Sequence, residues 1–205
     1  MRCGVVLFPG SNCDHDVYHV LKHVLEQDVV YLWHEETTLK GCDFIVLPGG
    51  WSYGDYLRGG AMAALSPVMA SVRAHAARGG PVLGICNGFQ VLTEARLLPG
   101  ALRRNRGLKF ECRDTYLRVE RNDLDFTSCY RQGQVLRLPI AHGEGNYEHF
   151  PEELDRLEAN RQIVFRYVSP SGGEDDNGNP DRPARALAGS ENAAMVAAAF
   201  SVSSS

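Results

Sequence analysis

Cys86 lies where a short apolar run meets a glycine-flanked turn, and this junction limits the folds that the chain can adopt. The run Val82–Ile85 is typical of a strand, and it leads directly into Cys86. A nucleophile on a sharp strand-to-helix turn needs small residues two positions before and two after it, because larger side chains would collide with the folded-back backbone. Gly84 and Gly88 occupy those positions. The pattern predicts a nucleophile raised above a sheet edge, and the alternative is a buried structural cysteine.

The turn also predicts the chemistry of the thiol. A helix is expected from Phe89 to Ala95, and the first N–H groups of a helix have no partner within it. Such groups, aimed at Cys86, favour the thiolate.

Alternating strand and helix patterns predict the fold. Continuous apolar strands joined by helices indicate a mostly parallel sheet with helices on both faces, an α/β fold of three layers. A small antiparallel addition is expected after Arg113, with strands over Tyr116–Val119 and Gln134–Pro139. The strands expected before it are Cys3–Phe8, Val29–Trp33, Asp43–Leu47 and Val82–Ile85, and the helices Asp14–Leu25, Ala61–Arg78 and Phe89–Ala95. A short helix is expected at Pro151–Leu157 and a strand at Ile163–Val168.

Composition excludes several classes of protein. A formal net charge of -4 and a pI of about 6.0 argue against a nucleic-acid or membrane surface. No segment has the pattern of a signal peptide or of a membrane span. The six cysteines are scattered without a C-x-x-C pair, which argues against a zinc site or disulfides and predicts a cytoplasmic protein.

The carboxyl ends of the parallel strands are the predicted location of a site, because ligands of such sheets bind there. The loops expected there are Pro9–Asn12, Pro48–Gly60, Cys86–Gln90 and Ala141–Tyr147. Gly49 and Gly50 end a strand, and a glycine pair there can offer a backbone N–H as an oxyanion donor opposite Cys86. The alternative for this glycine-rich loop is a flexible surface segment.

The histidines of the chain could act as general bases or as metal ligands. His142 and Glu144 form a His-x-Glu, a pattern that suits a general base and its orienting carboxylate. The alternative is a loop that lines a substrate pocket. His15, His19 and His23 share a helix face without a completing ligand set, so no metal site is predicted. His34 is expected in a solvated loop.

Several motifs in order resemble those of class I (triad-type) glutamine amidotransferases, and in particular the glutaminase subunits of phosphoribosylformylglycinamidine synthases. The resemblance runs from about residue 3 to about residue 168. Its motifs are Gly84-Ile85-Cys86-Asn87-Gly88-Phe89-Gln90, Phe8-Pro9-Gly10-Ser11-Asn12-Cys13-Asp14, Leu47-Pro48-Gly49-Gly50, Ser52-Tyr53-Gly54-Asp55-Tyr56-Leu57-Arg58-Gly59-Gly60 and Ala141-His142-Gly143-Glu144-Gly145.

The resemblance implies a flavodoxin-like fold and hydrolysis of L-glutamine to glutamate and ammonia, with Cys86 attacking the side-chain amide. Backbone donors near Gly50 and Asn87 would hold the oxyanion, and Gln90 and the loop of His142 and Gly143 would line the glutamine pocket. It implies no cofactor in this subunit. The partners would be a large synthetase subunit, which uses ATP and magnesium to amidate formylglycinamide ribonucleotide in purine biosynthesis, and a small bridging subunit.

The carboxyl-terminal part departs from the family pattern. The family takes its catalytic His and Glu from a late Pro-His-Pro-Glu segment that this sequence lacks, and its last histidine is His149. His142 and Glu144 match a different motif, so the triad roles are not assigned to them. We expect a domain over residues 1–188, an atypical tail over 189–205 from a frameshift or truncation near residue 190, and a lost or altered last strand and helix. Weak or absent glutaminase activity of this exact chain is predicted, with a scaffold subunit or a related cysteine hydrolase as alternatives.

Overall fold

The computed structural model describes residues 1–124 and 126–173. These residues belong to two compact units that divide after Pro99. The predicted bounds of a domain over residues 1–188 stay a prediction. The tail expected from residue 189, and the altered last strand and helix, lie outside the described residues.

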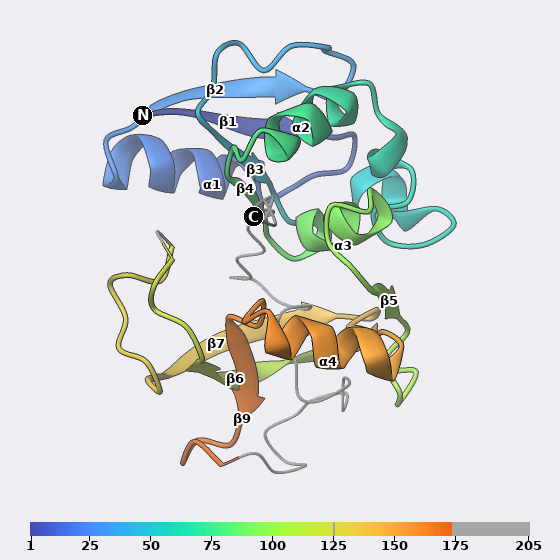
Figure 1. Ribbon diagram of the computed structural model, residues 1–205. Coiled ribbons are helices and arrows are strands. Elements are labelled where there is room, and N and C mark those ends of the chain that lie inside the picture. The colour runs from blue at the N-terminus through green and yellow to red at the C-terminus, as the bar shows by residue number, and fades with distance from the viewer. Residues whose placement is uncertain (125, 174–205) are drawn as a thin grey trace. The chain divides into compact units, whose positions relative to one another are not determined.

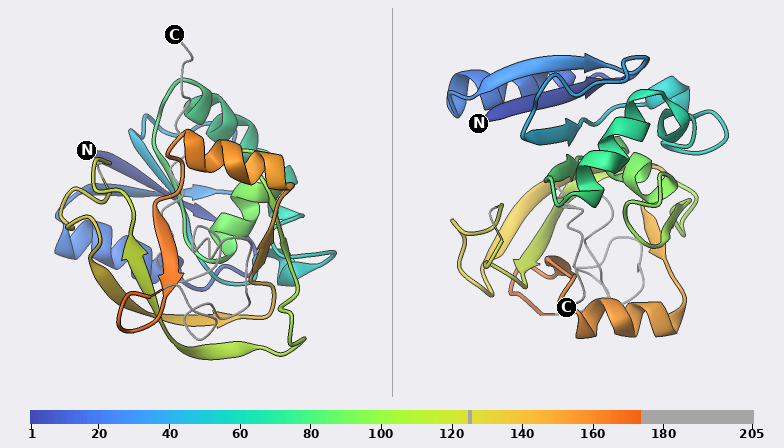
Figure 2. Two further views of the ribbon diagram at one scale, coloured as in Figure 1. Left: turned by 60° about the horizontal axis from the view of Figure 1, so that its bottom comes forward. Right: turned by 45° about the horizontal axis from the view of Figure 1, so that its top comes forward.

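The first unit, residues 1–99, is built on a parallel sheet. Its strands run in the order β2-β1-β3-β4, and every pairing between neighbours is parallel. All four residues of β3 are buried, which requires cover on both faces of the sheet. The mostly parallel α/β sheet predicted from the sequence is therefore confirmed (Figures 1 and 2). The strands are β1 (Arg2–Leu7), β2 (Asp28–Trp33), β3 (Phe44–Leu47) and β4 (Val82–Gly84).

Three α-helices accompany this sheet, and one of them is shorter than predicted. The expected helix over 61–78 was wrong in its first part, where a short 3-10 turn, Ala63–Leu65, is followed by Ser66 in an extended conformation. The reason is Pro67, since the residue before a proline is driven away from helical geometry. The helices are α1 (Asp14–His19), which continues into a π-helical turn at Val20–Val24, α2 (Val68–Ala77) and α3 (Asn87–Glu94).

The second unit is antiparallel, as predicted for the region after Arg113. Its main sheet has the order β7-β6-β9, and β5 pairs with β8 in a separate two-stranded ladder. The sequence reasoning missed β5 and β8, because three residues are too few to show a strand period. The elements are β5 (Ala101–Arg103), β6 (Glu111–Val119), β7 (Val135–His142), β8 (Asn146–Glu148), α4 (Pro151–Ala159) and β9 (Phe165–Val168).

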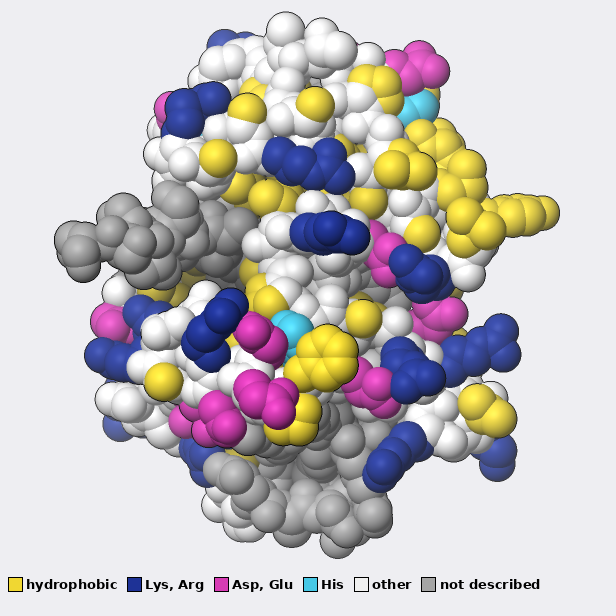
Figure 3. All heavy atoms as spheres, turned by 45° about the vertical axis from the view of Figure 1, so that its right-hand side comes forward, with side chains coloured by type: hydrophobic (Ala, Val, Ile, Leu, Met, Phe, Trp, Pro, Cys, Tyr) yellow, Lys and Arg dark blue, Asp and Glu magenta, His cyan; other side chains and the backbone are white. Residues whose placement is uncertain are grey.

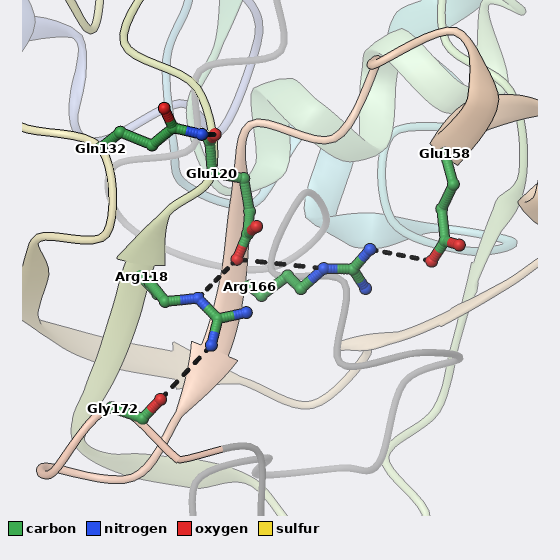
Figure 4. Close-up of polar contacts among 6 residues, drawn as sticks. All are labelled: Arg118, Glu120, Gln132, Glu158, Arg166 and Gly172. Carbon is green, nitrogen blue, oxygen red and sulfur yellow. Dashed lines mark hydrogen bonds and ion pairs between the residues drawn. The ribbon is translucent and has the colours of Figure 1, made fainter.

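Strand alternation divides the main sheet of this unit into an apolar face and a charged face. Leu117, Val119, Phe165 and Tyr167 form a buried cluster. The residues between them carry charge, and Figure 4 shows the resulting chain of ion pairs. Its contacts are Arg118 Nε to Glu120 Oε1 at 2.7 Å, Arg166 Nε to Glu120 Oε1 at 4.0 Å, and Arg166 Nη2 to Glu158 Oε1 at 2.8 Å. The last contact fastens α4 to β9.

Candidate active site

Cys86 occupies the strand-to-helix turn that the sequence predicts. It lies between the end of β4 and the start of α3, with φ 51° and ψ -111°. A residue with a side chain adopts this backbone region only at a cost of about 1–3 kcal/mol. The surrounding structure therefore holds Cys86 in a strained conformation, as is usual for a nucleophile elbow.

Gly84 and Gly88 are small because backbone lies against them. A Cβ added at Gly88 would stand 1.9 Å from the carbonyl oxygen of Leu47, and one added at Gly84 would stand 2.7 Å from the carbonyl oxygen of Gly88. Neither position has room for a side chain. The reason given for the glycines in the Gly-x-Cys-x-Gly turn is thus confirmed.

Two backbone amides point at the sulfur. The N–H groups of Asn87 and Gly50 donate hydrogen bonds to the Cys86 side chain. Gly50 has φ 130°, a conformation that favours glycine, and a Cβ added there would stand 2.7 Å from the amide nitrogen of Asn12. The pair of donors has the arrangement predicted for an oxyanion site, although the role itself stays a prediction.

The pKa of the Cys86 thiol is raised above its usual value of 9.0. Burial is the largest cause, and the nearby Cys13 and Asp55 raise the pKa further. The hydrogen bonds from Asn87 and Gly50 lower it, as the sequence reasoning expected of the amides. Desolvation outweighs the two donors, so the pKa of the thiol is raised in total.

The loops after β1 and β3 are tied together beside this turn. Ser11 and Gly50 form an isolated antiparallel bridge. The amide of Trp51 donates to the carbonyl of Gly10 at 3.1 Å, and the amide of Tyr53 donates to the carbonyl of Pro9 at 2.6 Å. These loops, together with the turn at Cys86, are three of the four predicted at the carboxyl ends of the strands.

The Asn87 side chain fastens the glycine-rich loop to α3. Its Oδ1 accepts from the amide of Ser52 at 3.0 Å, and its Nδ2 donates to Asp55 Oδ1 at 3.0 Å and to Gln90 Oε1 at 2.8 Å. Asn87 is almost fully buried. These bonds argue against the flexible surface segment considered as an alternative. Sequence reasoning missed Ser52 and Asp55 as partners, and their only signal was membership in the 52–60 motif.

The fourth loop, with His142 and Gly143, belongs to the second unit. His142 is buried at the end of β7, and its Nδ1 lies 2.9 Å from Asn105 Oδ1. The amide of Gly145 also donates to Asn105 Oδ1, at 2.8 Å, while Asn105 Nδ2 donates to the carbonyl of His142 at 2.9 Å. Asn105 thus organises this loop. The glutamine-lining role of His142 and Gly143 stays a prediction.

Burial and the charge of Arg113 lower the pKa of His142 from 6.5 to about 4. The imidazole is therefore neutral at pH 7. Because Nδ1 faces an oxygen that can only accept, Nδ1 carries the proton in this geometry.

His34 was expected in a solvated loop, and this expectation was wrong. Its side chain is buried, and Nδ1 lies 2.7 Å from the hydroxyl of Tyr53, which also lies 3.1 Å from Ser66 Oγ. The loop that contains Tyr53 is what covers this histidine.

Among residues 1–124 and 126–173, no group of three or more His, Cys, Asp or Glu side chains is placed to hold a metal ion.

Over the same residues, no helix is long and apolar enough to cross a membrane. The predicted frameshift or truncation near residue 190 falls outside the described residues. The weak activity predicted with it stays a prediction.

The known proteins that resemble this chain match it over most of its length. Residues 1–192 match the family model of the CobB/CobQ-like glutamine amidotransferase domain. The phosphoribosylformylglycinamidine synthase subunit PurQ of Gloeobacter violaceus is 57% identical over 189 residues, which cover 92% of this chain and 82% of that protein. The protein of the same name from Synechococcus elongatus is 54% identical, with 93% of each chain covered.

A solved structure agrees with these relatives. The structure of PurLQS from Thermotoga maritima superposes with a TM-score of 0.79 at 36% sequence identity, over 97% of this chain and 85% of that one.

Proposed function

The chain belongs to the CobB/CobQ-like glutamine amidotransferase family, and on that premise we propose that it is the glutaminase subunit of phosphoribosylformylglycinamidine synthase. It hydrolyses L-glutamine to glutamate and ammonia for the purine pathway. The observation that carries this proposal is the strained Cys86 turn with the amides of Asn87 and Gly50 directed at the sulfur.

The chemistry follows from that geometry. The Cys86 sulfur attacks the side-chain amide carbon of glutamine, and the carbonyl oxygen takes up negative charge that the two amides stabilise. The C–N bond then breaks, and ammonia leaves with the proton that the thiol gave up. Water cleaves the resulting thioester to release glutamate and restore the thiol.

The raised pKa of Cys86 means that its proton must be removed during attack, and a base is needed for this step. No histidine of the first unit, within the described part of the chain, is hydrogen-bonded to the sulfur. Asn87 and Gln90, joined through their side chains, are the residues of α3 that we assign to the glutamine pocket.

The partners are a large synthetase subunit and a small bridging subunit, in agreement with the similarity to the PurLQS structure. We assign no cofactor to this chain, and ATP with magnesium to the synthetase. We place the assembly in the cytoplasm, because the scattered free cysteines suit a reducing compartment. The matches do not favour a related cysteine hydrolase or a scaffold without catalysis.

A glutamine analogue with an electrophilic carbon, 6-diazo-5-oxo-L-norleucine, tests the proposal directly. We expect it to add to Cys86, as seen by peptide mass spectrometry, and an excess of L-glutamine to protect the thiol. Cys86→Ser should abolish the addition, whereas the matched Cys13→Ser variant should keep it. Addition that glutamine does not reduce, or addition at another cysteine, would contradict the proposal.

In the assembled three-subunit enzyme, Cys86→Ser should abolish synthesis that depends on glutamine and retain synthesis that depends on added ammonium. Loss of both would assign Cys86 a role outside ammonia production.

A further inference from the structure

The segment that frames the Cys86 turn exposes an unusual number of large apolar side chains. We define residues 51–65 as the rim segment. It exposes Trp51, Tyr56, Leu57, Met62 and Leu65, of which Leu57 is 88% exposed, Leu65 82% and Tyr56 74%. Figure 3 shows hydrophobic side chains gathered and projecting at one edge of the first unit. An apolar cluster of this kind on a folded domain is typical of a binding surface.

The backbone of the rim segment is strained where it presents these side chains. Tyr53, Asp55 and Leu57 have φ of 54°, 52° and 73°, which side-chain-bearing residues seldom adopt. The conformation of Tyr53 is explained by its partly buried hydrogen bond to His34. Leu57 has no such explanation, because a nearly fully exposed leucine gains nothing from packing in its own chain. Strain without a folding benefit points to a function.

The rim segment is nevertheless held firmly. The Asn87 side chain bonds both Ser52 and Asp55. Arg58 Nε and Nη2 donate to Glu94 Oε1 and Oε2 at 2.5 and 2.6 Å, which makes a bidentate ion pair with α3. At Gly60 an added Cβ would stand 2.5 Å from the amide nitrogen of Val91, so the backbone packs directly on α3. A surface that is already ordered loses little entropy when a partner binds.

We propose that the rim segment is the surface on which the large synthetase subunit docks. This inference rests on the proposed function, because ammonia made at Cys86 has to pass to that subunit. The anchor of the rim segment, Asn87, directly follows the nucleophile, so the rim is continuous with the site from which ammonia leaves. Its aromatic and leucine side chains suit the core of a protein interface.

Charge supports the same occupant. Arg58 and Glu94 neutralise each other, so this edge offers no excess positive charge to a phosphate or a nucleic acid. What is left exposed is apolar and rigid, and such a surface fits a folded protein partner.

The test compares substitutions at two highly exposed leucines that both have a positive φ. Leu57→Asp places a charge on the rim segment, and Leu108→Asp is the matched control, since Leu108 is 78% exposed with φ 53° but belongs to the second unit. Binding of the full chain to its synthetase and small subunits is measured by sedimentation velocity. We expect Leu57→Asp to weaken binding to the synthetase by about tenfold or more, and Leu108→Asp by less than about twofold. Tyr56→Ser serves as a second rim variant.

Labelling of Cys86 by 6-diazo-5-oxo-L-norleucine separates the two proposals. We expect Leu57→Asp to be labelled at the wild-type rate, since the docking surface is not part of the reaction. Synthetase binding within twofold of wild type in both rim variants would overturn the inference while leaving the proposed function intact. Slower labelling would also overturn it, because the segment would then act on the nucleophile.

The same experiment can reveal two other occupants of the rim segment. If Leu57→Asp weakened binding to the small subunit alone, or converted a self-associated wild-type chain to a monomer, the synthetase would not be the occupant. A wild-type chain that neither assembles nor shows glutamine-protected labelling would refute the proposed function itself, and the docking inference with it.

Discussion

Gly88→Ala is the substitution whose cost the structure defines most sharply. The new Cβ would start 1.9 Å from the carbonyl oxygen of Leu47, and this contact has to open to about 3.0 Å, a retreat of about 1.1 Å. Leu47 is fully buried, and the same carbonyl accepts the amide of Ile85 at 2.9 Å. The retreat therefore strains the packing of β3 or breaks that hydrogen bond.

The expected loss of stability combines these two effects. Overpacking of a filled core costs about 1–3 kcal/mol, and a lost backbone hydrogen bond costs about 1 kcal/mol. We expect Gly88→Ala to lower the free energy of unfolding by about 2–4 kcal/mol. Labelling of Cys86 should also slow by about 100-fold, because a shift of about 1 Å misplaces the reacting groups.

Urea unfolding followed by tryptophan fluorescence measures this effect in the relevant part of the chain. Both tryptophans, Trp33 and Trp51, belong to the first unit, so the signal reports on the unit that contains the elbow. Gly59→Ala is the matched control. Its Cβ would start 2.6 Å from the Gln90 carboxamide, a side-chain end whose displacement costs its hydrogen bond to Asn87 and strains no backbone, so we expect a loss of about 1 kcal/mol.

Equal losses in Gly88→Ala and Gly59→Ala would refute the reasoning, since only one of them meets rigid backbone. A change of less than about 0.5 kcal/mol in Gly88→Ala would refute it as well.

Three further predictions concern titration and the buried amide network. Because burial raises the pKa of Cys86, its alkylation rate should still be rising at pH 9, and a plateau below pH 8 in a mass-spectrometric rate profile would contradict this. Folding lowers the pKa of His142 to about 4, so the unfolded chain binds more protons than the folded chain between pH 4 and 6.5. The free energy of unfolding is therefore highest above pH 6.5 and declines by up to about 3 kcal/mol as the pH falls to 4. His142→Gln should flatten this part of the pH profile, measured by circular dichroism. Asn87→Ala leaves the amide of Ser52 without its acceptor and should lower the free energy of unfolding by about 1–3 kcal/mol in the same urea assay. Asn87→Asp should lose at least as much, because its second carboxylate oxygen would face Asp55 Oδ1, to which the Nδ2 of Asn87 donates.

The parts of the fold that follow from local pattern were predictable. The apolar runs of β1 and β3 identify buried parallel strands, and Gly84 with Gly88 identifies the turn at Cys86. The predictions that failed concern residues whose conformation depends on particular neighbours. Pro67 interrupts a helix that the alanine-rich spacing alone would continue.

The site was predictable where backbone geometry defines it and less so where side chains do. Gly49 and Gly50 end an apolar strand, so the amide donor at Gly50 followed from the sequence. Two of the three partners of the Asn87 side chain, Asp55 and Ser52, are 32 and 35 residues away along the chain, and no spacing rule connects them. His34 was misjudged for the same reason, because its partner Tyr53 comes from a different loop.

The elbow favours placement of the sulfur over its ionisation. If the amides of Asn87 and Gly50 served chiefly to stabilise a resting thiolate, the pKa of Cys86 would be lowered, yet burial raises it. The donors are therefore better matched to charge that develops later, on the substrate oxygen, when attack begins. Donors fixed in advance act at full strength in a desolvated site, and the rigid contact at Gly88 is what fixes the turn that carries Asn87. Stability and reactivity are thus coupled at this one turn, so a variant that relaxes its backbone should lose both together.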